Sequence, residues 1–383
     1  MCRLGTRSLA APMVFLAILG LSFYAYAAAD AVRIGAILPL TGSSSLTGIE
    51  MKYGAMIAED EINAAGGIMG KKFEIIFEDS QSTPAAGVEA AHKLIDIDKV
   101  PAVIGDYASS VTIAIQQYAQ ERKTLAWAVA SSSEKMAEMG DYCFNSGNLD
   151  NSVSPAVARF AFNQGHKRAV IFAPDNDYGR GAAKYLKIGF EEAGGKIIDT
   201  ILFQVGQSSY RTEIRRVFAD NPDCVLYTAY SGDSMVITKE IYEMGLKDKA
   251  QFYDLYLSMC TASAVPEAVA GHRGLESWTK GPRAERLEKL FEQKTGSGPK
   301  TPYAAYAYDT VWLVALTMNL SNSTNPDKLK TVAHTAARIY YGVTGDKRVD
   351  DHGQQMTESK GRCEVSLNQG KYGISCQDDW QRQ

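Results

Sequence analysis

Pro101-Ala102-Val103-Ile104-Gly105-Asp106-Tyr107-Ala108-Ser109-Ser110 joins an apolar strand, through a glycine, to the start of a helix that carries two adjacent hydroxyls. The first turn of a helix presents backbone N–H groups without partners at the positive end of the helix dipole. Such a turn can hold a small carboxylate without a lysine or an arginine. A serine at a helix start is also among the commonest structural caps. The stretch therefore allows two interpretations, a cap or an anion site, and the rest of the chain must decide between them.

Short apolar strands alternate with amphipathic helices along the chain, which is the pattern of a parallel sheet covered by helices on both faces. In the first half, strands are expected over residues 32–38, 73–77, 102–104 and 125–129, with helices that begin near Gly48, Pro84 and Ser109. After Asp150, strands are expected over residues 169–173, 197–203, 225–228 and 251–257, with helices that begin near Arg180, Arg211 and Asp233. The pattern predicts an α/β fold of two similar doubly wound parallel-sheet lobes.

The C-terminal part adds helices and then strands to this alternation. Helices are expected over residues 283–295, 303–320 and 326–337, followed by a β-rich tail. This order is explained if the chain returns to the first lobe and then crosses to the second lobe again. We therefore predict that lobe 1 comprises residues 30–150 plus 281–341 and that lobe 2 comprises residues 151–280 plus 342–383. The three crossings between the lobes would form a hinge.

The N-terminus has the features of a secretory signal peptide. Arg3 and Arg7 precede an apolar run over residues 9–21, and small residues at 25–29 offer cleavage sites. The run is too short to span a membrane comfortably. We expect residues 1–29 to be removed on export to the periplasm. The formal net charge of −4 has no long run of one sign, which argues against nucleic acid or an anionic membrane surface as a partner.

The cysteines do not suggest a metal site. Five remain after residue 29, and they include no Cys-x-x-Cys pair and have no cluster of histidines beside them. Cys363 and Cys376 flank an alternating stretch with Asn368-Gln369-Gly370 as its turn, so they can face each other across a hairpin in an oxidising compartment. The sequence leaves two alternatives for this pair of cysteines, a disulfide or two free thiols. We expect no metal and no cofactor.

Motifs of catalysis and of nucleotide binding are not found. Gly179-Arg180-Gly181 is the nearest approach to a dinucleotide fingerprint, but Lys184 stands in place of the third glycine. No Walker sequence, His-Glu-x-x-His or Gly-x-Ser-x-Gly pattern occurs. The histidines lie in unrelated polar contexts and are expected at the surface: His92, His166, His272, His334 and His352. Nothing in these patterns supports an enzyme.

Hydroxyl and phenol groups recur where the expected strands end. They are Ser109 and Ser110, Ser131 to Ser133, Tyr178, Tyr230 and Tyr256. Ligands of parallel α/β sheets bind outside the carboxyl ends of the strands, and two facing lobes would share one cleft. A tyrosine taken singly is more often a packing residue with a wet hydroxyl. The clustering at strand ends favours reversible capture of a small polar molecule.

Five motifs spread over nearly the whole mature chain strengthen this interpretation. They are Ile34-Gly35-Ala36 to Pro39-Leu40-Thr41-Gly42, Ile62-Asn63-Ala64-Ala65-Gly66-Gly67-Ile68, Val103-Ile104-Gly105 with Ser109-Ser110, Tyr178-Gly179 with Gly181, and Ala304-Tyr306-Tyr308-Asp309. Together they resemble the type I periplasmic substrate-binding proteins of ABC importers, in the group that binds leucine, isoleucine, valine and related ligands. The resemblance implies a monomer, not an enzyme, that closes on its ligand and hands it to an ABC permease of the inner membrane.

The resemblance also implies a site for a ligand carboxylate in lobe 1. Ser109, with Ser110 beside it, corresponds to a serine that binds the carboxylate from the helix start. Ala130 corresponds to a residue that offers its backbone. Ser132 stands where the family usually places a threonine against the same group. The two parts of this implied site, Ser109 with Ser110 and Ala130 with Ser132, each follow the end of an expected strand of lobe 1.

Other parts of the implied site come from the lobe 2 side and from the mouth of the cleft. Tyr178 and Tyr230 resemble residues that close over the ligand, and Asp150 lies at the first crossing. Leu46 and Thr47 belong to a loop of lobe 1 at the cleft mouth.

The sequence leaves two candidates for the residue that would pair with an ammonium group of the ligand. Amino-acid binders of this kind place a carboxylate after the strand that here ends in Asp254-Leu255-Tyr256, and Tyr256 takes that position. Asp254 lies two residues earlier on the same face of a strand, so a register shift would bring it to the cleft. An amino acid and an amine-free aromatic or aliphatic carboxylate or amide are therefore alternative ligands. A sensory module that docks on a receptor is an alternative to transport.

Overall fold

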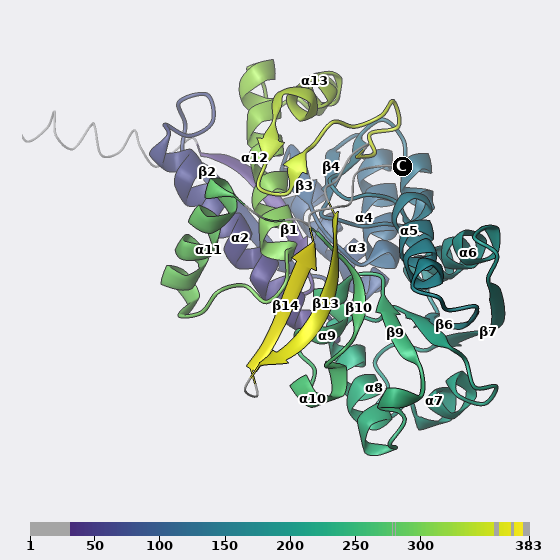
Figure 1. Cartoon of the computed structure of the whole chain (residues 1–383). Coiled ribbons are helices and arrows are strands. Elements are labelled where there is room, and N and C mark those ends of the chain that lie inside the picture. Colours follow the sequence, from purple (N-terminus) through teal and green to yellow (C-terminus); the bar gives the residue numbers. More distant parts are fainter. Residues whose placement is uncertain (1–30, 278, 280, 356–359, 369–370, 378–383) are drawn as a thin grey trace, which may run out of the picture.

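The computed structural model describes residues 31–377 apart from 278, 280, 356–359 and 369–370, and it contains two large sheets with helices packed on their faces (Figure 1). The predicted α/β class with parallel-sheet lobes is confirmed. The predicted signal peptide, residues 1–29, lies outside the described residues. Within the described part of the chain, no helix has the length and apolar character needed to cross a membrane.

The sheet of lobe 1 has five parallel strands in the order β2-β1-β3-β4-β5. These strands are β1 (Val32–Leu38), β2 (Phe73–Asp79), β3 (Ala102–Ile104), β4 (Leu125–Ala128) and β5 (Cys143–Asn145). The helices are α2 (Ser45–Ala64), α3 (Pro84–His92), the π-helix η1 (Lys93–Ile97), α4 (Ser109–Glu121), the 3-10 helix η2 (Glu134–Glu138), α11 (Pro282–Thr295), α12 (Tyr303–Ser321) and α13 (Pro326–Ile339). Most of β1 is buried because helices cover both faces of the sheet.

The sheet of lobe 2 has seven strands in the order β14-β13-β10-β9-β8-β6-β7. The parallel strands are β6 (Arg168–Pro174), β7 (Lys196–Phe203), β8 (Cys224–Tyr227), β9 (Gln251–Asp254) and β10 (Arg273–Ser277), and the antiparallel hairpin β13 (Lys360–Asn368) and β14 (Lys371–Gln377) completes one edge. The helices are α5 (Asp150–Asn163), α6 (Asp177–Glu192), α7 (Arg211–Val217), α8 (Ser231–Glu243), η3 (Lys247–Lys249), α9 (Leu257–Thr261) and α10 (Pro266–Val269).

The sequence patterns did not predict α5, β5 or β10. Helix α5 begins with turn-forming residues and contains Pro155, a residue that usually ends a helix. Strand β10 contains Gly274, where a Cβ atom would lie 2.1 Å from the Asp254 carbonyl oxygen of the neighbouring strand. Close backbone approach therefore requires glycine in β10, although glycine lowers the strand propensity of the segment.

The last crossing into lobe 2 comes later than predicted. Residues 342–355 were expected in lobe 2, but they contact lobe 1. The strands β11 (Tyr341–Gly342) and β12 (Gly345–Asp346) form a small antiparallel sheet, and the intervening Val343 and Thr344 donate backbone hydrogen bonds of 2.8 Å to Asp309 of α12. The Gln354 amide donates to the Met136 carbonyl of lobe 1 at 2.9 Å. Lobe 2 resumes only with β13.

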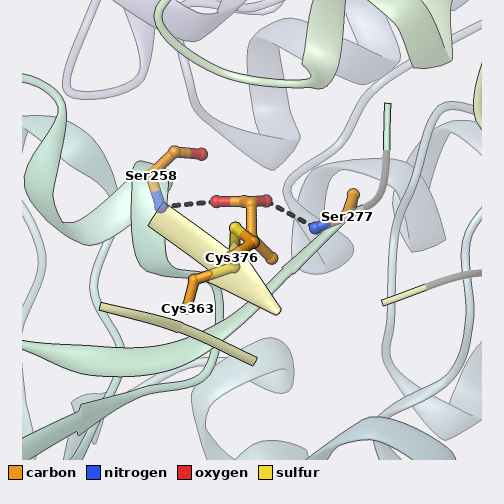
Figure 2. The surroundings of a disulfide bond; sticks show 5 residues. Ser258, Ser277, Cys363 and Cys376 are labelled. Atoms are coloured by element: carbon orange, nitrogen blue, oxygen red, sulfur yellow. Dashed lines mark hydrogen bonds between the residues drawn. A yellow bond between two sulfur atoms is a disulfide. The ribbon is translucent and has the colours of Figure 1, made fainter. Parts of the chain in front are cut away.

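A disulfide joins Cys363 of β13 to Cys376 of β14, which are paired in the ladder (Figure 2). Of the two alternatives left open for these residues, the structure contains the disulfide. Cys363 packs against Leu257, which follows the end of β9. Beside the disulfide, the Glu276 carboxylate accepts hydrogen bonds from the backbone N–H groups of Ser258 (2.6 Å) and Ser277 (2.7 Å). The hairpin thus supports the loop that leaves β9.

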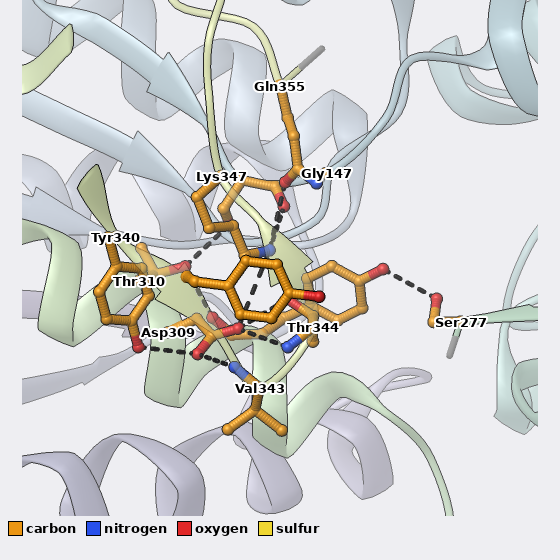
Figure 3. A network of polar contacts seen from close by, with 12 residues as sticks. Gly147, Ser277, Asp309, Thr310, Tyr340, Val343, Thr344, Lys347 and Gln355 are labelled. Atoms are coloured by element: carbon orange, nitrogen blue, oxygen red, sulfur yellow. Dashed lines mark hydrogen bonds and ion pairs between the residues drawn. The ribbon is translucent and has the colours of Figure 1, made fainter. Parts of the chain in front are cut away.

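Helix α12 contacts all three crossings between the lobes (Figure 3). At the first crossing, the hydroxyl of Ser146 lies 2.8 Å from that of Thr310. At the second, the hydroxyl of Ser277 lies 2.8 Å from that of Tyr306. At the third, Lys347 approaches the helix. The two lobes are therefore connected at one place on lobe 1.

The third contact is a buried ion pair. Both Lys347 and Asp309 are fully buried, and the ammonium lies 4.0 Å from the carboxylate. Lys347 also donates to the Ser146 carbonyl (3.1 Å) and to the Gln355 side chain (3.2 Å), and it lies 4.8 Å from the centre of the Tyr306 ring. The cation thereby joins the first and third crossings, and its partners offset the cost of taking a charge out of water.

We predict that Lys347→Met lowers the free energy of unfolding by about 3 kcal/mol, because it leaves a buried carboxylate without its cation. Urea denaturation would measure this loss. Lys239→Met is the matched control, since the side chain of Lys239 is 61% exposed and its ion pair with Glu243 spans 3.7 Å. The control should change stability by less than about 0.5 kcal/mol. Equal losses in the two variants would contradict a stabilising role for the buried pair.

Candidate functional site

The turn between β3 and α4 is built around Gly105 and Asp106. Gly105 has φ +115°, and a Cβ atom there would lie 1.9 Å from the Ile37 carbonyl oxygen, so only glycine fits. The buried Asp106 carboxylate accepts hydrogen bonds from the Ser80 hydroxyl (2.6 Å) and from the backbone N–H groups of Tyr107 (2.6 Å) and Ala108 (2.9 Å). Burial raises the pKa of Asp106 to about 6, while these donors lower it. The turn is thus fixed before the helix begins.

Ser109 joins this helix start to the end of the next strand. Ala108 is the N-cap of α4, so Ser109 is the first helical residue and does not cap its own helix. Its Oγ accepts hydrogen bonds from the backbone N–H groups of Ser132 (3.3 Å) and Ser133 (3.2 Å). A hydroxyl that accepts in this way still has its own proton to donate. Ser110 follows in the same turn and is half-buried.

The loop after β4 is held tightly beside that helix start. Ala130 has φ +62°, a left-handed conformation that is rare for alanine, and Gly147 leaves room for it, since a Cβ on Gly147 would lie 2.5 Å from the Ala130 Cα atom. The hydroxyl of Ser131 lies 2.7 Å from that of Thr112 in α4. The side chain of Asn145 donates to the Ser131 carbonyl at 2.6 Å. Residues 130–133 therefore present a fixed surface to the first turn of α4.

Asp150, at the first crossing, is a buried carboxylate without a counter-charge. Its backbone N–H donates to the Ser132 carbonyl at 2.6 Å, but neither carboxylate oxygen makes a hydrogen bond of ordinary length within the described part of the chain. Gly181 of α6 lies against this carboxylate, and a side chain there would collide with it, since a Cβ atom on Gly181 would lie 2.6 Å from Oδ2 of Asp150. Burial raises the pKa of Asp150 well above its ordinary value, and Ser132 lowers it less strongly. Such a group calls for a partner.

Six tyrosines form a continuous set across the two lobes, which we call the tyrosine row. In order it comprises Tyr256, Tyr178, Tyr230, Tyr107, Tyr303 and Tyr306, with 6.3, 5.7, 5.7, 4.9 and 6.0 Å between successive ring centres. The first three belong to lobe 2 and the last three to lobe 1. Separations of this size are those of favourable aromatic pairs. The structure brings together the three predicted tyrosines, while the sequence analysis missed the three from lobe 1.

Most hydroxyls of the tyrosine row are anchored. The Tyr178 hydroxyl lies 2.5 Å from that of Thr228, and Tyr230 accepts from the Asn176 amide at 3.4 Å. Tyr303 donates to the sulfur of Met259 at 3.4 Å. These bonds fix the rings, so they form a preorganised wall beside the start of α4.

The two residues considered for the ammonium partner lie in different surroundings. The Asp254 carboxylate lies 2.9 Å from Nδ1 of His272, and that ring stacks on Phe252 with 4.6 Å between the centres. Asp254 shares a strand face with Phe252, whereas Tyr256 lies beyond the strand end, beside Tyr178. The expectation that His272 lies at the surface is wrong, because it is buried and paired with Asp254.

The lobes touch each other on both sides of these residues. The hydroxyl of Thr47 lies 3.2 Å from that of Ser231 in α8, while Leu46 beside it is 39% exposed. On the other side, Lys135 pairs with Asp177 at 2.5 Å, and Lys184 pairs with Glu134 at 2.7 Å. The two lobes are therefore in direct contact on both sides of the residues at the start of α4.

Metal binding has no support in the described residues, which contain no group of three or more histidine, cysteine or acidic side chains suited to a metal ion. The cysteines outside the disulfide, Cys143, Cys224 and Cys260, are buried.

We predict that Asp150→Asn stabilises the ligand-free protein at pH 7. The pKa of the Asp150 carboxyl group is higher in the folded protein than the value of about 3.9 in the unfolded chain. The neutral carboxyl group therefore contributes its full stability below about pH 4. This stability is lost as the pH rises through the folded-state pKa, because the buried group must then ionise. The amide cannot ionise, so the gain should shrink as the pH falls toward 4.

Urea denaturation of refolded, ligand-free protein between pH 4 and pH 8 would measure this pH dependence. Asp248→Asn is the control, since its side chain is 93% exposed. A gain for Asp150→Asn that does not vary with pH would argue against an uncompensated charge.

Known proteins share this architecture. The sequence profile described as "periplasmic binding protein" matches residues 31–360. An amino acid binding protein from Pseudomonas aeruginosa is 26% identical over 357 residues, which are 90% of this chain and 94% of that protein. A Leu/Ile/Val-binding protein homolog from Brucella abortus is 26% identical over 328 residues, which are 84% of this chain and 87% of that protein.

Solved structures with different ligands superpose equally well. A branched-chain amino acid transporter substrate-binding protein from Streptococcus pneumoniae, in complex with isoleucine, gives a TM-score of 0.79 at 22% identity and covers 91% of this chain and 99% of its own. A solute-binding protein of an ABC transporter from R. palustris, in complex with benzoate, gives 0.81 at 18% identity and covers 90% and 95%. At these identities the likeness concerns the fold.

Proposed function

Because the chain belongs to the periplasmic binding protein family, whose matched members are substrate-binding proteins and not enzymes, we propose that it captures a small carboxylate-bearing solute between its lobes and delivers it to an ABC permease. The capture would take place where the lobes meet, beside the start of α4. The observation that carries this proposal is the junction of Ser109 with Ser132 and Ser133, which sets a hydroxyl at a helix start that has no side-chain cap.

The carboxylate would lie at the first turn of α4. There the Ser109 hydroxyl donates to one ligand oxygen, and the helix N-terminus supplies N–H groups and positive potential. The left-handed backbone of Ala130 and the Ser132 hydroxyl flank the same point. These are neutral donors, so they bind a carboxylate without an ion pair, which suits reversible capture.

The ligand we favour is an α-amino acid whose ammonium lies against Asp150. Asp254 is already paired with His272, whereas neither oxygen of Asp150 has a hydrogen-bond partner in the described residues. A ligand ammonium would compensate this buried charge and restore its ionised form. The aromatic wall of the tyrosine row suits a large apolar side chain on the same ligand.

The tyrosine row also favours a second candidate, an amine-free aromatic carboxylate. An aromatic ring could pack edge-to-face on these tyrosines, and burial favours the neutral form of Asp150 when no ammonium is present. Tyr178, Tyr230 and Tyr256 lie on lobe 2 and would contact either ligand only after closure. Closure would therefore be favoured by the ligand, and the closed form would be the one presented to the permease.

We predict that Ser109→Ala weakens binding of any carboxylate ligand by about 1.5–3 kcal/mol, the range for a hydrogen bond to a charged group. A thermal-shift panel of amino acids, aromatic acids and amides would first identify a ligand, and calorimetry would then compare the variants. Ser321→Ala, a change at the far end of α12, should leave affinity unchanged. Equal affinity for wild type and Ser109→Ala would contradict the carboxylate site.

Asp150→Asn separates the two candidate ligands. L-Phenylalanine and 3-phenylpropionate share a ring and a carboxylate but differ in the amine, so they form a matched pair. If the ligand is an amino acid, the variant should lose at least about tenfold in affinity for L-phenylalanine and little for 3-phenylpropionate, because only the first loses an ion pair. Tight binding of 3-phenylpropionate alone by the wild type would instead establish the amine-free ligand.

A further inference from the structure

Tyr107 differs from its two neighbours in the tyrosine row because, among the described residues, its hydroxyl makes no hydrogen bond of ordinary length. The side chain is only 4% exposed, and its oxygen is buried. The ring itself is held between Tyr230 of lobe 2, at 5.7 Å, and Tyr303 of lobe 1, at 4.9 Å. A buried hydroxyl without a partner costs about 1–3 kcal/mol, so its presence between the lobes calls for an explanation.

Other buried hydroxyls lie around that of Tyr107. Ser44 and Thr47, at the start of α2, are 2% and 0% exposed, and Ser231 of α8 is 2% exposed. The hydroxyls of Thr47 and Ser231 lie 3.2 Å apart across the two lobes. Burial raises the pKa of Tyr107, and weak interactions with the hydroxyls of Ser44 and Thr47 lower it. Buried hydroxyls from both lobes therefore gather at this end of the tyrosine row.

Tyr107 is also two residues before Ser109, so its hydroxyl and the proposed carboxylate site are parts of one turn. The turn cannot shift to hide the hydroxyl, because the backbone N–H of Tyr107 donates to Asp106 at 2.6 Å. We propose that Tyr107 is a specificity-determining residue whose hydroxyl binds a hydroxyl or carbonyl group on the part of the ligand farthest from its carboxylate.

This inference rests on the proposed function and narrows its ligand class. A ligand whose far end carries a polar group would satisfy the orphan hydroxyl, whereas a purely hydrocarbon end would leave it unpaired on closure. Sites built to hydrogen-bond a ligand hydroxyl reject analogues that lack it, since both buried groups then lose their partners.

Two matched pairs of ligands test the proposal whether or not the ligand carries an amine. The pairs are L-tyrosine with L-phenylalanine, and 3-(4-hydroxyphenyl)propionate with 3-phenylpropionate. In the pair that binds, the wild type should prefer the hydroxylated member by about tenfold or more. Tyr107→Phe, which removes one oxygen and keeps the ring, should reduce that preference to less than about twofold.

Tyr253→Phe is the matched control. Tyr253 is fully buried and its hydroxyl also makes no hydrogen bond of ordinary length to the described residues, but its ring packs on Phe160 and His166 within lobe 2. This variant should keep the wild-type preference, and urea denaturation would show that both variants are folded.

Equal affinities of the wild type for both members of the pair, or a preference that survives in Tyr107→Phe, would overturn the role of Tyr107. Binding of a pair with no effect from Ser109→Ala would count against the proposed carboxylate site instead, so the two failures are distinguishable.

Discussion

The buried ammonium of Lys347 organises the junction between the lobes. A charge in this position needs hydrogen-bond acceptors, and it finds them in the Ser146 carbonyl of the first crossing, in Gln355 and in the nearby Asp309 carboxylate. Helix α12 supplies Asp309 and also contacts the second crossing through Tyr306. The same helix begins with Tyr303, in the tyrosine row. One rigid element thus touches both the hinge and the cleft.

Buried carboxylates elsewhere in the chain show what is unusual about the cleft. Asp106 accepts three hydrogen bonds, and Asp309 accepts bonds from backbone and side-chain donors and lies near a lysine. Asp254 has a histidine. Asp150, by contrast, has its backbone anchored and its carboxylate unsatisfied. The first three carboxylates have partners within the protein, whereas Asp150 has none among the described residues, and that difference supports the proposal that Asp150 faces a ligand.

Local patterns predicted much of the fold because strands such as residues 32–38 and 102–104 are apolar runs bounded by turn residues. The resemblance to the binding-protein family placed Ser109 and Ser132 on the same ligand carboxylate, and both residues follow the ends of expected strands. The pairing of Asp254 with His272 was not predictable in this way, since it depends on the register between β9 and β10. Residues 342–355 were misplaced for a similar reason, because their contacts with Asp309 and Met136 are long-range. The three lobe 1 tyrosines gave no periodic signal.

The order of the chain has a consequence for its biogenesis. Lobe 1 needs α11, α12, α13 and residues up to 355, and the edge of the lobe 2 sheet needs β13 and β14, from the last described segment. Neither lobe can bury its full set of surfaces until almost the whole polypeptide is available, and contacts of such long range form late. We therefore expect both lobes to complete their packing only after the β13–β14 hairpin has become available.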